Sequence, residues 1–158
     1  MNKMHHYAVA ITWTGNKGVG TKDYRSYERS HTISIDNKID IKGSSDAAFR
    51  GDKTMHSPED LFVASIAACH MLWYLHLCSD AGIVVTSYID HATATMIETD
   101  DGGGRFAEVT LHPEVMITDA AMIAKAQELN HKANELCFIA RSCNFPIHHK
   151  PVITSTGN

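Results

Sequence analysis

The stretch from Leu61 to Cys78 constrains the fold more than any other part of the chain. Its 18 residues are apolar apart from Ser65, His70 and His76, so a helix formed here is apolar on nearly every side. The length would suit a membrane span, but the two histidines, the acidic residues before the run and the flanking strand patterns favour a buried central helix. A domain of 158 residues needs sheet on most sides of such a helix, and a second subunit for part of the cover.

Capping signals mark where this helix starts. Ser57 is a favoured N-cap residue, Pro58 suits the first helical position, and Glu59 and Asp60 complement the positive end of the helix dipole. Gly82 follows the apolar run and is predicted to end the helix.

Segments on either side of this helix alternate apolar and polar residues, which predicts strands. The predicted strands are 7–13, 31–35, 38–42, 84–97, 105–117 and 151–154. A second helix is predicted to begin at the capping pair Thr118-Asp119 and to end before Asn144-Phe145-Pro146. This order lacks regular β-α-β alternation, so it predicts a single α+β domain over residues 1–158 with antiparallel sheet wrapped over the helices.

The charge balance argues against two classes of partner. A net charge of -4 at pH 7 gives no uniform basic face, so we expect no nucleic-acid partner and no membrane partner. The N-terminal residues lead into a strand pattern without an apolar signal-peptide region, so we expect a cytoplasmic protein. Thiols are kept reduced in that compartment, where a cysteine pair that forms a disulfide is more often transient and catalytic than structural.

The four cysteines can be sorted by their spacing. Cys69 and Cys78 are nine residues apart on one predicted helix, half a turn out of phase, so they point to opposite faces. Cys137 and Cys143 are six apart and no Cys-x-x-Cys occurs, which disfavours a zinc knuckle. Cys137 is predicted to lie within the second helix, and packing of the two helices could bring it to Cys69.

Histidines beside the cysteines leave a further alternative open. His70 follows Cys69 directly and His131 precedes Cys137 by six residues. Each could be a metal ligand or a base, but the chain has 11 histidines, so such neighbours also arise by chance. A Cys/His metal site therefore stays an alternative, and its test is metal in the purified protein.

Six ordered fragments carry a resemblance that spans nearly the whole chain. The fragments are 13–21, 48–52, 57–61, 67–72, 102–106 and 136–140. Glu59 of the Pro58-Glu59 pair stands ten residues before Cys69, and the second cysteine, Cys137, lies near the end of a late helix. In this order the chain resembles the OsmC/Ohr family of peroxide-detoxifying proteins, and within it the OsmC-like branch. The resemblance implies antiparallel sheets wrapped around two long central helices in an intertwined homodimer.

The resemblance also implies an activity and its residues. It implies an organic hydroperoxide reductase that uses thiols without flavin, haem or metal and needs no bound cofactor. By position, Cys69 is the expected peroxidatic thiol, Cys137 the expected resolving thiol, and Glu59 the expected carboxylate. An arginine is expected to engage both the thiolate and the carboxylate. Candidates for it are Arg50, at the OsmC-type location, and Arg25 and Arg29, nearer the Ohr-type one. The disulfide would be reduced by an external dithiol, of the lipoyl type in Ohr relatives.

Physical chemistry gives an independent reason for these groups. Attack on a peroxide needs a thiolate, which burial in an apolar helix disfavours and a nearby guanidinium favours. Glu59 precedes Cys69 by ten residues, about 15 Å along a straight helix. If both act at one site, Glu59 must come from another subunit. We therefore expect an obligate homodimer with two sites at its interface.

Apolar side chains near the two cysteines suggest the substrate class. An apolar surround would favour organic hydroperoxides over hydrogen peroxide, although plain core packing explains the same residues. The residues concerned are Phe62, Met71, Trp73 and Phe138.

Two departures from the family bear on the second cysteine, and one other function remains open. Asn134 stands where many relatives have histidine, which removes a titrating neighbour of Cys137. Cys143 stands where relatives usually carry an aliphatic residue, so it could compete as the resolving thiol. A different hypothesis is a dimer that binds a small lipophilic ligand in an apolar cleft and leaves the cysteines unused.

Overall fold

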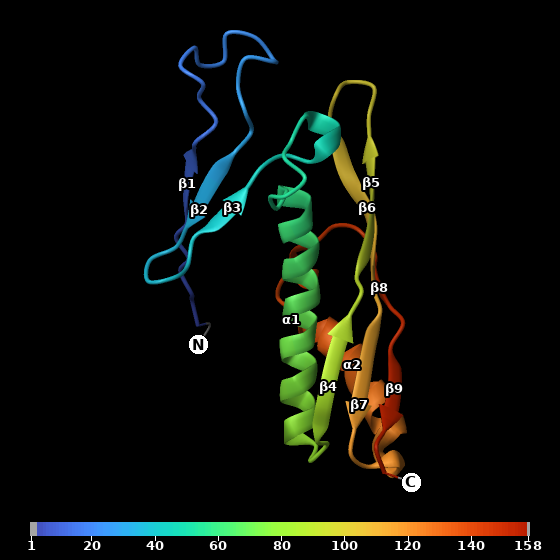
Figure 1. The fold of residues 1–158 in the computed structure, drawn as a ribbon. Coiled ribbons are helices and arrows are strands. Elements are labelled where there is room, and N and C mark those ends of the chain that lie inside the picture. The colour runs from blue at the N-terminus through green and yellow to red at the C-terminus, as the bar shows by residue number, and fades with distance from the viewer. Residues whose placement is uncertain (1–2, 158) are drawn as a thin grey trace. The chain divides into compact units, whose positions relative to one another are not determined.

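The computed structural model describes residues 3–157, and the chain divides into two compact units, 1–61 and 62–158. Helices and three-stranded sheets are mixed in the described part, so the predicted α+β class is confirmed (Figure 1). In chain order the elements are β1 (Ala10–Trp13), β2 (His31–Ser34), β3 (Ile41–Gly43), η1 (Ala47–Phe49), α1 (Pro58–Asp80), β4 (Val85–Asp90), β5 (Thr93–Glu98), β6 (Gly104–Leu111), β7 (Pro113–Ile117), η2 (Ala120–Met122), α2 (Ile123–Leu136), η3 (Ala140–Ser142), β8 (Ile147–His149) and β9 (Val152–Ser155).

The first unit contains one antiparallel sheet in the order β1-β2-β3, in which β2 and β3 are neighbours in sequence and pair with each other. Its register places Ile11 opposite Ile33 and Ile33 opposite Ile41, so three isoleucines form a row across one face. Thr12 and Thr32 form the neighbouring row on the opposite face. Because Ile11 is 63% exposed, the isoleucine face is incompletely covered in a single chain.

Helix α1 begins as the capping signals predict. The Ser57 hydroxyl accepts the Asp60 N–H at 3.0 Å, and the Asp60 carboxylate accepts the Ser57 N–H at 2.9 Å. These two reciprocal bonds satisfy two backbone donors at the helix start. Gly82, with φ +73°, takes the left-handed conformation just after the helix, where glycine is least strained.

Helix α1 is only partly covered by its own chain, and the sequence predicts that a second subunit supplies part of the cover. Its fully buried residues are spaced four apart, at Ile66, His70, Tyr74 and Cys78. One stripe is therefore packed inside, and it carries a histidine, a tyrosine and a thiol. Other faces stay apolar and open, with Leu72 63% exposed. By length and composition alone α1 could also cross a membrane.

The second unit holds two sheets, in the orders β4-β7-β9 and β5-β6-β8. The two long strands that the sequence predicts are each broken in two, at His91 and at His112. The break is held by the Asp90 carboxylate, which accepts the His112 N–H at 2.7 Å, and Pro113 follows directly. Strands β8 and β9 join parallel to β6 and β7, so the sheets are mixed rather than antiparallel. A parallel strand requires a crossover, and α2 lies within the connection from β7 to β9.

Two apolar clusters hold this unit together. Figure 1 shows α1 alongside β4, and the larger cluster packs the buried face of α1 against β7, β9 and α2. The residues buried in it are Tyr74, Cys78, Ile83, Val115, Ile117, Ala126, Leu129, Ala133 and Ile153. The smaller cluster centres on Ile66, Val109 and Leu111. The larger cluster therefore holds α1 and α2 in one core, and the smaller one packs α1 against β6.

The end of α2 lies earlier than the sequence predicts. The helix stops at Leu136, and Cys137 is its C-cap, with an extended backbone at φ -62° and ψ 115°. The chain then turns through η3 before β8. The prediction that Cys137 lies inside a helix is therefore wrong.

Candidate active site

Cys69 and Cys137 lie together in the second unit. Cys69 projects from the middle of α1 and is half-buried, whereas the Cys137 side chain is fully buried at the end of α2. The two thiols are close enough for Cys69 to act on the ionisation of Cys137, and no disulfide joins them. The structure therefore brings together the two cysteines that the sequence singles out.

The position of Cys137 at the helix end sets its chemistry. Because the chain turns there, the Ala140 N–H is directed at the Cys137 sulfur, with nitrogen and sulfur 3.4 Å apart. Burial raises the pKa of the Cys137 thiol to about 12, and contact with Cys69 acts in the same direction. The N–H groups of Ala140 and Ile139 oppose this rise. Cys137 is therefore a protonated thiol at neutral pH.

The other two cysteines have separate surroundings. Cys78 lies on the buried stripe of α1 beside Tyr74, and burial raises its pKa. The Cys143 thiol donates to the Ile139 carbonyl at 3.3 Å and packs against the smaller apolar cluster, and burial raises its pKa as well.

The predicted apolar surround is divided between surface and core. Trp73 and Phe138 pack edge to face, with ring centroids 5.5 Å apart, and Phe138 is 67% exposed. Leu72, Trp73 and His76 line an open depression of about 200 Å³, one to two turns along α1 from Cys69. These side chains offer an apolar surface near the thiol.

Phe62 belongs to the core instead. Its ring lies 5.1 Å from that of Phe106 and 6.0 Å from that of Phe145, within the smaller cluster. Core packing therefore explains Phe62.

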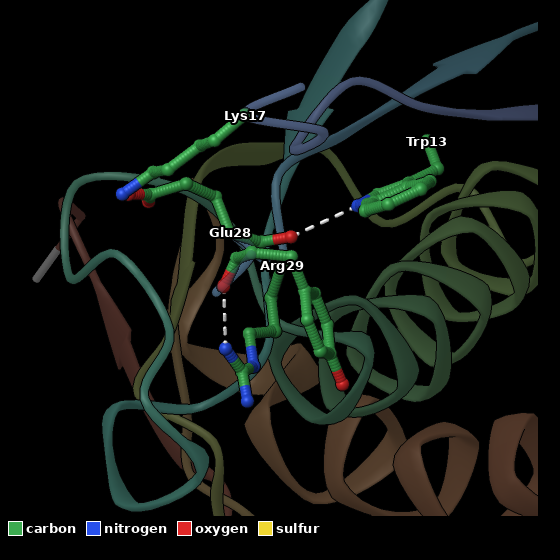
Figure 2. A network of polar contacts seen from close by, with 5 residues as sticks. Trp13, Lys17, Glu28 and Arg29 are labelled. Carbon is green, nitrogen blue, oxygen red and sulfur yellow. Dashed lines mark hydrogen bonds and ion pairs between the residues drawn. The ribbon is translucent and has the colours of Figure 1, made fainter. Parts of the chain in front are cut away.

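Of the three arginines considered, Arg29 is committed to the first unit. Its guanidinium lies over the rings of Tyr24 and Tyr27, 4.2 and 4.3 Å from their centroids, and donates to the carbonyls of both residues at 2.7 Å. Figure 2 shows this arginine among the contacts that close the segment after β1, with the Trp13 indole donating to the Glu28 carbonyl at 2.9 Å. Arg29 is therefore a structural residue here.

Arg50 is placed differently. It is exposed and follows η1 in the left-handed conformation, with φ 65°, which is uncommon for a residue with a side chain. Within residues 3–157 its guanidinium makes no hydrogen bond or ion pair. The fold fixes this turn tightly, because a Cβ on the next residue, Gly51, would collide with the Ser45 carbonyl oxygen. Arg25 is exposed.

Glu59 also lacks a counterion among the described residues. It lies in the first turn of α1, and its Oε2 atom is shielded from solvent without a hydrogen-bond donor. A shielded carboxylate oxygen without a donor is costly. Among the described residues, neither Arg50 nor Glu59 thus has an oppositely charged partner. The two side chains, which both belong to the first unit, do not form an ion pair with each other.

A histidine cluster lies beside α1; it contains His70 and His131, which the sequence offered as possible ligands or bases, and His149, which sequence reasoning missed. The His70 ring is 1% exposed, and its centroid is 5.8 Å from that of His149 on β8. The His149 centroid is 4.6 Å from that of His131 on α2. The spacing of His70 with Tyr74 and Cys78 is the sequence signal that His70 lies on one buried stripe of α1. The contact with His149 could not be predicted, because β8 is distant along the chain.

The cluster holds a neutral imidazole inside the protein. Burial lowers the pKa of His70 to about 4, the neighbouring His149 adds to this, and the nearby Asn130 amide opposes it. Burial also lowers the pKa of His149. Neither His70 ring nitrogen, nor either polar atom of the Asn130 amide, has a completed hydrogen bond. Across residues 3–157, no three His, Cys, Asp or Glu side chains converge in a geometry that could hold a metal ion.

Comparisons with known proteins agree on one family. A sequence model of OsmC-like proteins matches residues 51–151. The organic hydroperoxide resistance protein OhrB of Bacillus subtilis (strain 168) is 32% identical over 113 residues, which are 72% of this chain and 80% of OhrB.

Solved structures add the fold. An OsmC-like protein of unknown function from Vibrio cholerae matches with a TM-score of 0.85 and 26% identity, over 94% of this chain and 100% of that one. An organic hydroperoxide resistance protein from Elizabethkingia anophelis matches with a TM-score of 0.70 and 19% identity, over 99% and 100% of the two chains. On the family match and the identity to OhrB, the chain belongs to the OsmC-like protein family.

Proposed function

We propose that this chain is a thiol-dependent peroxidase that reduces organic hydroperoxides. The observation that carries the proposal is a half-buried Cys69 thiol set against a fully buried, protonated Cys137 thiol from a different element. A reactive thiol with a second thiol at hand is the arrangement that peroxide reduction by disulfide formation needs. The name of the relative OhrB, an organic hydroperoxide resistance protein, supports the same chemistry.

The proposed cycle balances as follows. The Cys69 thiolate attacks the distal oxygen of the hydroperoxide, the O–O bond breaks, and the alkoxide takes a proton and leaves as an alcohol. Cys69 is then a sulfenic acid. The Cys137 sulfur attacks the Cys69 sulfur, the S–O bond breaks, and the Cys137 proton leaves with the hydroxyl group as water. A cytoplasmic dithiol, of the lipoyl type, reduces the resulting disulfide by thiol exchange.

Activation of Cys69 requires a cation, and we assign this role to Arg50 with Glu59 as its orienting partner. A guanidinium favours the thiolate and stays charged, and a carboxylate can hold it through two parallel hydrogen bonds. The unused charges of Arg50 and Glu59 support this assignment. Glu59 lies ten residues before Cys69 on α1, so we propose that it serves the Cys69 of a second copy of the chain.

The aromatic pair of Trp73 and Phe138 suits the organic part of a hydroperoxide. Trp73 and Phe138 present aromatic surface where an alkyl or aryl group can be removed from water. Hydrogen peroxide has no such group and gains nothing from this contact. We therefore expect cumene hydroperoxide to react faster than hydrogen peroxide.

The proposed dimer rests on two apolar surfaces that one chain leaves open. One is the outer surface of α1 around Leu72, and the other is the isoleucine row of the first sheet. Soluble proteins rarely leave contiguous apolar surface open to water unless a partner covers it. A second copy brings the same surfaces and also the missing Glu59, so we propose a homodimer with shared active sites.

The peroxidase proposal predicts a specific loss of thiols. Reduced protein treated with one equivalent of cumene hydroperoxide should lose two titratable thiols per chain, and peptide mass spectrometry should find Cys69 joined to Cys137. The Cys69→Ser variant should lose none, because no nucleophile remains. The Cys78→Ser variant is the matched control and should behave as the wild type.

Two other outcomes decide between the alternatives. Unchanged thiols in the wild type, together with saturable binding of cumyl alcohol, would reject the peroxidase and favour the lipophilic ligand-binding dimer. A disulfide that joins Cys69 to Cys143 would show that Cys143 is the resolving thiol.

The dimer proposal predicts the mass at which the protein sediments and a fall in that mass in an interface variant. The wild type should sediment at twice the 17.4 kDa of the chain, whereas Leu72→Glu should shift towards the monomer because it places a charge in the covered surface. Gln127→Glu adds the same charge at an exposed position of α2 and should stay dimeric. A wild type that sediments as a monomer at micromolar concentration would rule out the dimer.

A further inference from the structure

We propose that His70 and Asn130 fix the register in which α1 and α2 hold Cys69 against Cys137, so that both are positioning residues for disulfide closure. The inference rests on the proposed peroxidase function. It concerns the second step of the cycle, in which Cys137 captures the sulfenic acid on Cys69, and leaves the reaction with peroxide to other groups.

The placement of the four residues carries the argument. His70 is the residue after Cys69 on α1, and Asn130 lies two turns before Cys137 on α2. Asn130 and Ala133 are fully buried on one face of α2, and Cys137, also fully buried, caps the end of that helix. Cys69 and His70 are therefore neighbours on α1, and the His70 and Asn130 side chains lie near each other, so this polar pair joins the two elements that lead to the thiols.

Stability alone does not explain this polar pair. His70 is 1% exposed and Asn130 is 0% exposed, and none of the four polar atoms of their side chains has a completed hydrogen bond. An apolar pair of similar size would pack without that desolvation cost. Buried polar groups between helices are best known as devices that fix register at a cost in stability. The pair here is placed to do so at the helices that carry the two thiols.

Disulfide closure is the step that such register control affects most. The S–S bond demands a narrow range of Cα and Cβ separations, so a slip or rotation of α1 against α2 leaves the two sulfurs unable to join. Attack of the Cys69 thiolate on the peroxide makes no such demand. In a misaligned protein the sulfenic acid would form at its usual rate and then persist.

The experiment separates these two steps. Reduced protein is mixed with cumene hydroperoxide in the presence of dimedone, which traps sulfenic acid, and mass spectrometry measures the ratio of dimedone adduct to Cys69–Cys137 disulfide. In His70→Leu this ratio should rise about tenfold, since small misplacements of reacting groups cost this much or more. His70→Gln keeps a polar side chain and should restore most of the wild-type ratio. Asn130→Leu tests the contact from α2 and should raise the ratio as His70→Leu does.

Tyr74→Phe is the matched control. Tyr74 lies one turn from His70 on the same buried stripe, and its hydroxyl also lacks a completed hydrogen bond. Its loss removes a buried polar group from α1 without touching the contact with Asn130, so the ratio should stay at the wild-type value. A wild-type ratio in both His70→Leu and Asn130→Leu would overturn the inference, as would an equal rise in Tyr74→Phe. A wild type that forms neither adduct nor disulfide would instead reject the peroxidase function and this inference with it.

Discussion

Replacing Arg50 with methionine is expected to slow the oxidation of Cys69 by cumene hydroperoxide about a hundredfold, the usual scale for losing one preorganised charge at a reacting group. In the proposed mechanism the variant lacks the cation that activates the nucleophile and donates a hydrogen bond to the peroxide. Stability should change little, because the Arg50 side chain is exposed and methionine keeps its length. The measurement is the rate of thiol loss under excess peroxide, followed by stopped flow.

Arg29→Met is the matched comparison, because it removes the same group from a different setting. That guanidinium lies over Tyr24 and Tyr27 and donates to two carbonyls, so its loss should reduce the free energy of unfolding by about 1–3 kcal/mol. The oxidation rate of the folded fraction should stay within about threefold of the wild type. A slow Arg29→Met or Arg25→Met beside a normal Arg50→Met would move the catalytic assignment to that arginine.

Acidification is expected to lower the free energy of unfolding by about 3 kcal/mol through His70 alone. The pKa of His70 is about 4 in the folded protein, against an ordinary value of 6.5. The unfolded chain therefore binds more protons between these two values, and stability falls as the pH is lowered from 6.5 to about 4. A difference of about 2.5 pKa units corresponds to roughly 3 kcal/mol, at 1.36 kcal/mol for each unit. Above pH 6.5, His70 makes no contribution to the pH dependence of the free energy of unfolding.

Urea unfolding at a series of pH values tests this linkage. The wild type should lose stability between pH 6.5 and 4, and His70→Leu should lose markedly less, because leucine does not titrate. The hydrogen bonds with Ser57 lower the pKa of Asp60. The stability that the α1 cap loses on acidification is therefore lost at lower pH, and it is lost in both proteins. Equal losses in the wild type and His70→Leu would show that His70 does not bind its proton in this window.

The sequence predicted best those features that depend on neighbouring residues. Ser57 and Asp60 specify the start of α1 by reciprocal bonds within one turn, and the structure has these bonds. The family resemblance singled out Cys69 and Cys137, which the structure places together. The opposed directions of Cys69 and Cys78 follow from helical geometry, and Cys78 indeed lies in the core.

Features that depend on distant contacts were harder to predict. Strand patterns show no break at His112, because the bend needs the Asp90 carboxylate, which is 22 residues away. His149 contacts His70 only through the packing of β8. The alternation of residues along a three-residue strand does not predict where that strand packs. Helix periodicity also continues past Leu136, although the turn that follows releases Cys137 from the helix.

The burial of Cys137 decides which sulfur of a Cys69–Cys137 disulfide a reductant meets. Its side chain has no exposed surface, whereas Cys69 has some, so an incoming thiolate can form its mixed disulfide only on Cys69. Cys137 is then the leaving group, and with its raised pKa it departs slowly unless a proton reaches it. The N–H groups of Ile139 and Ala140, aimed at this sulfur, ease its departure. In the proposed cycle, the turn after α2 thus serves the reductive half as much as the oxidative half.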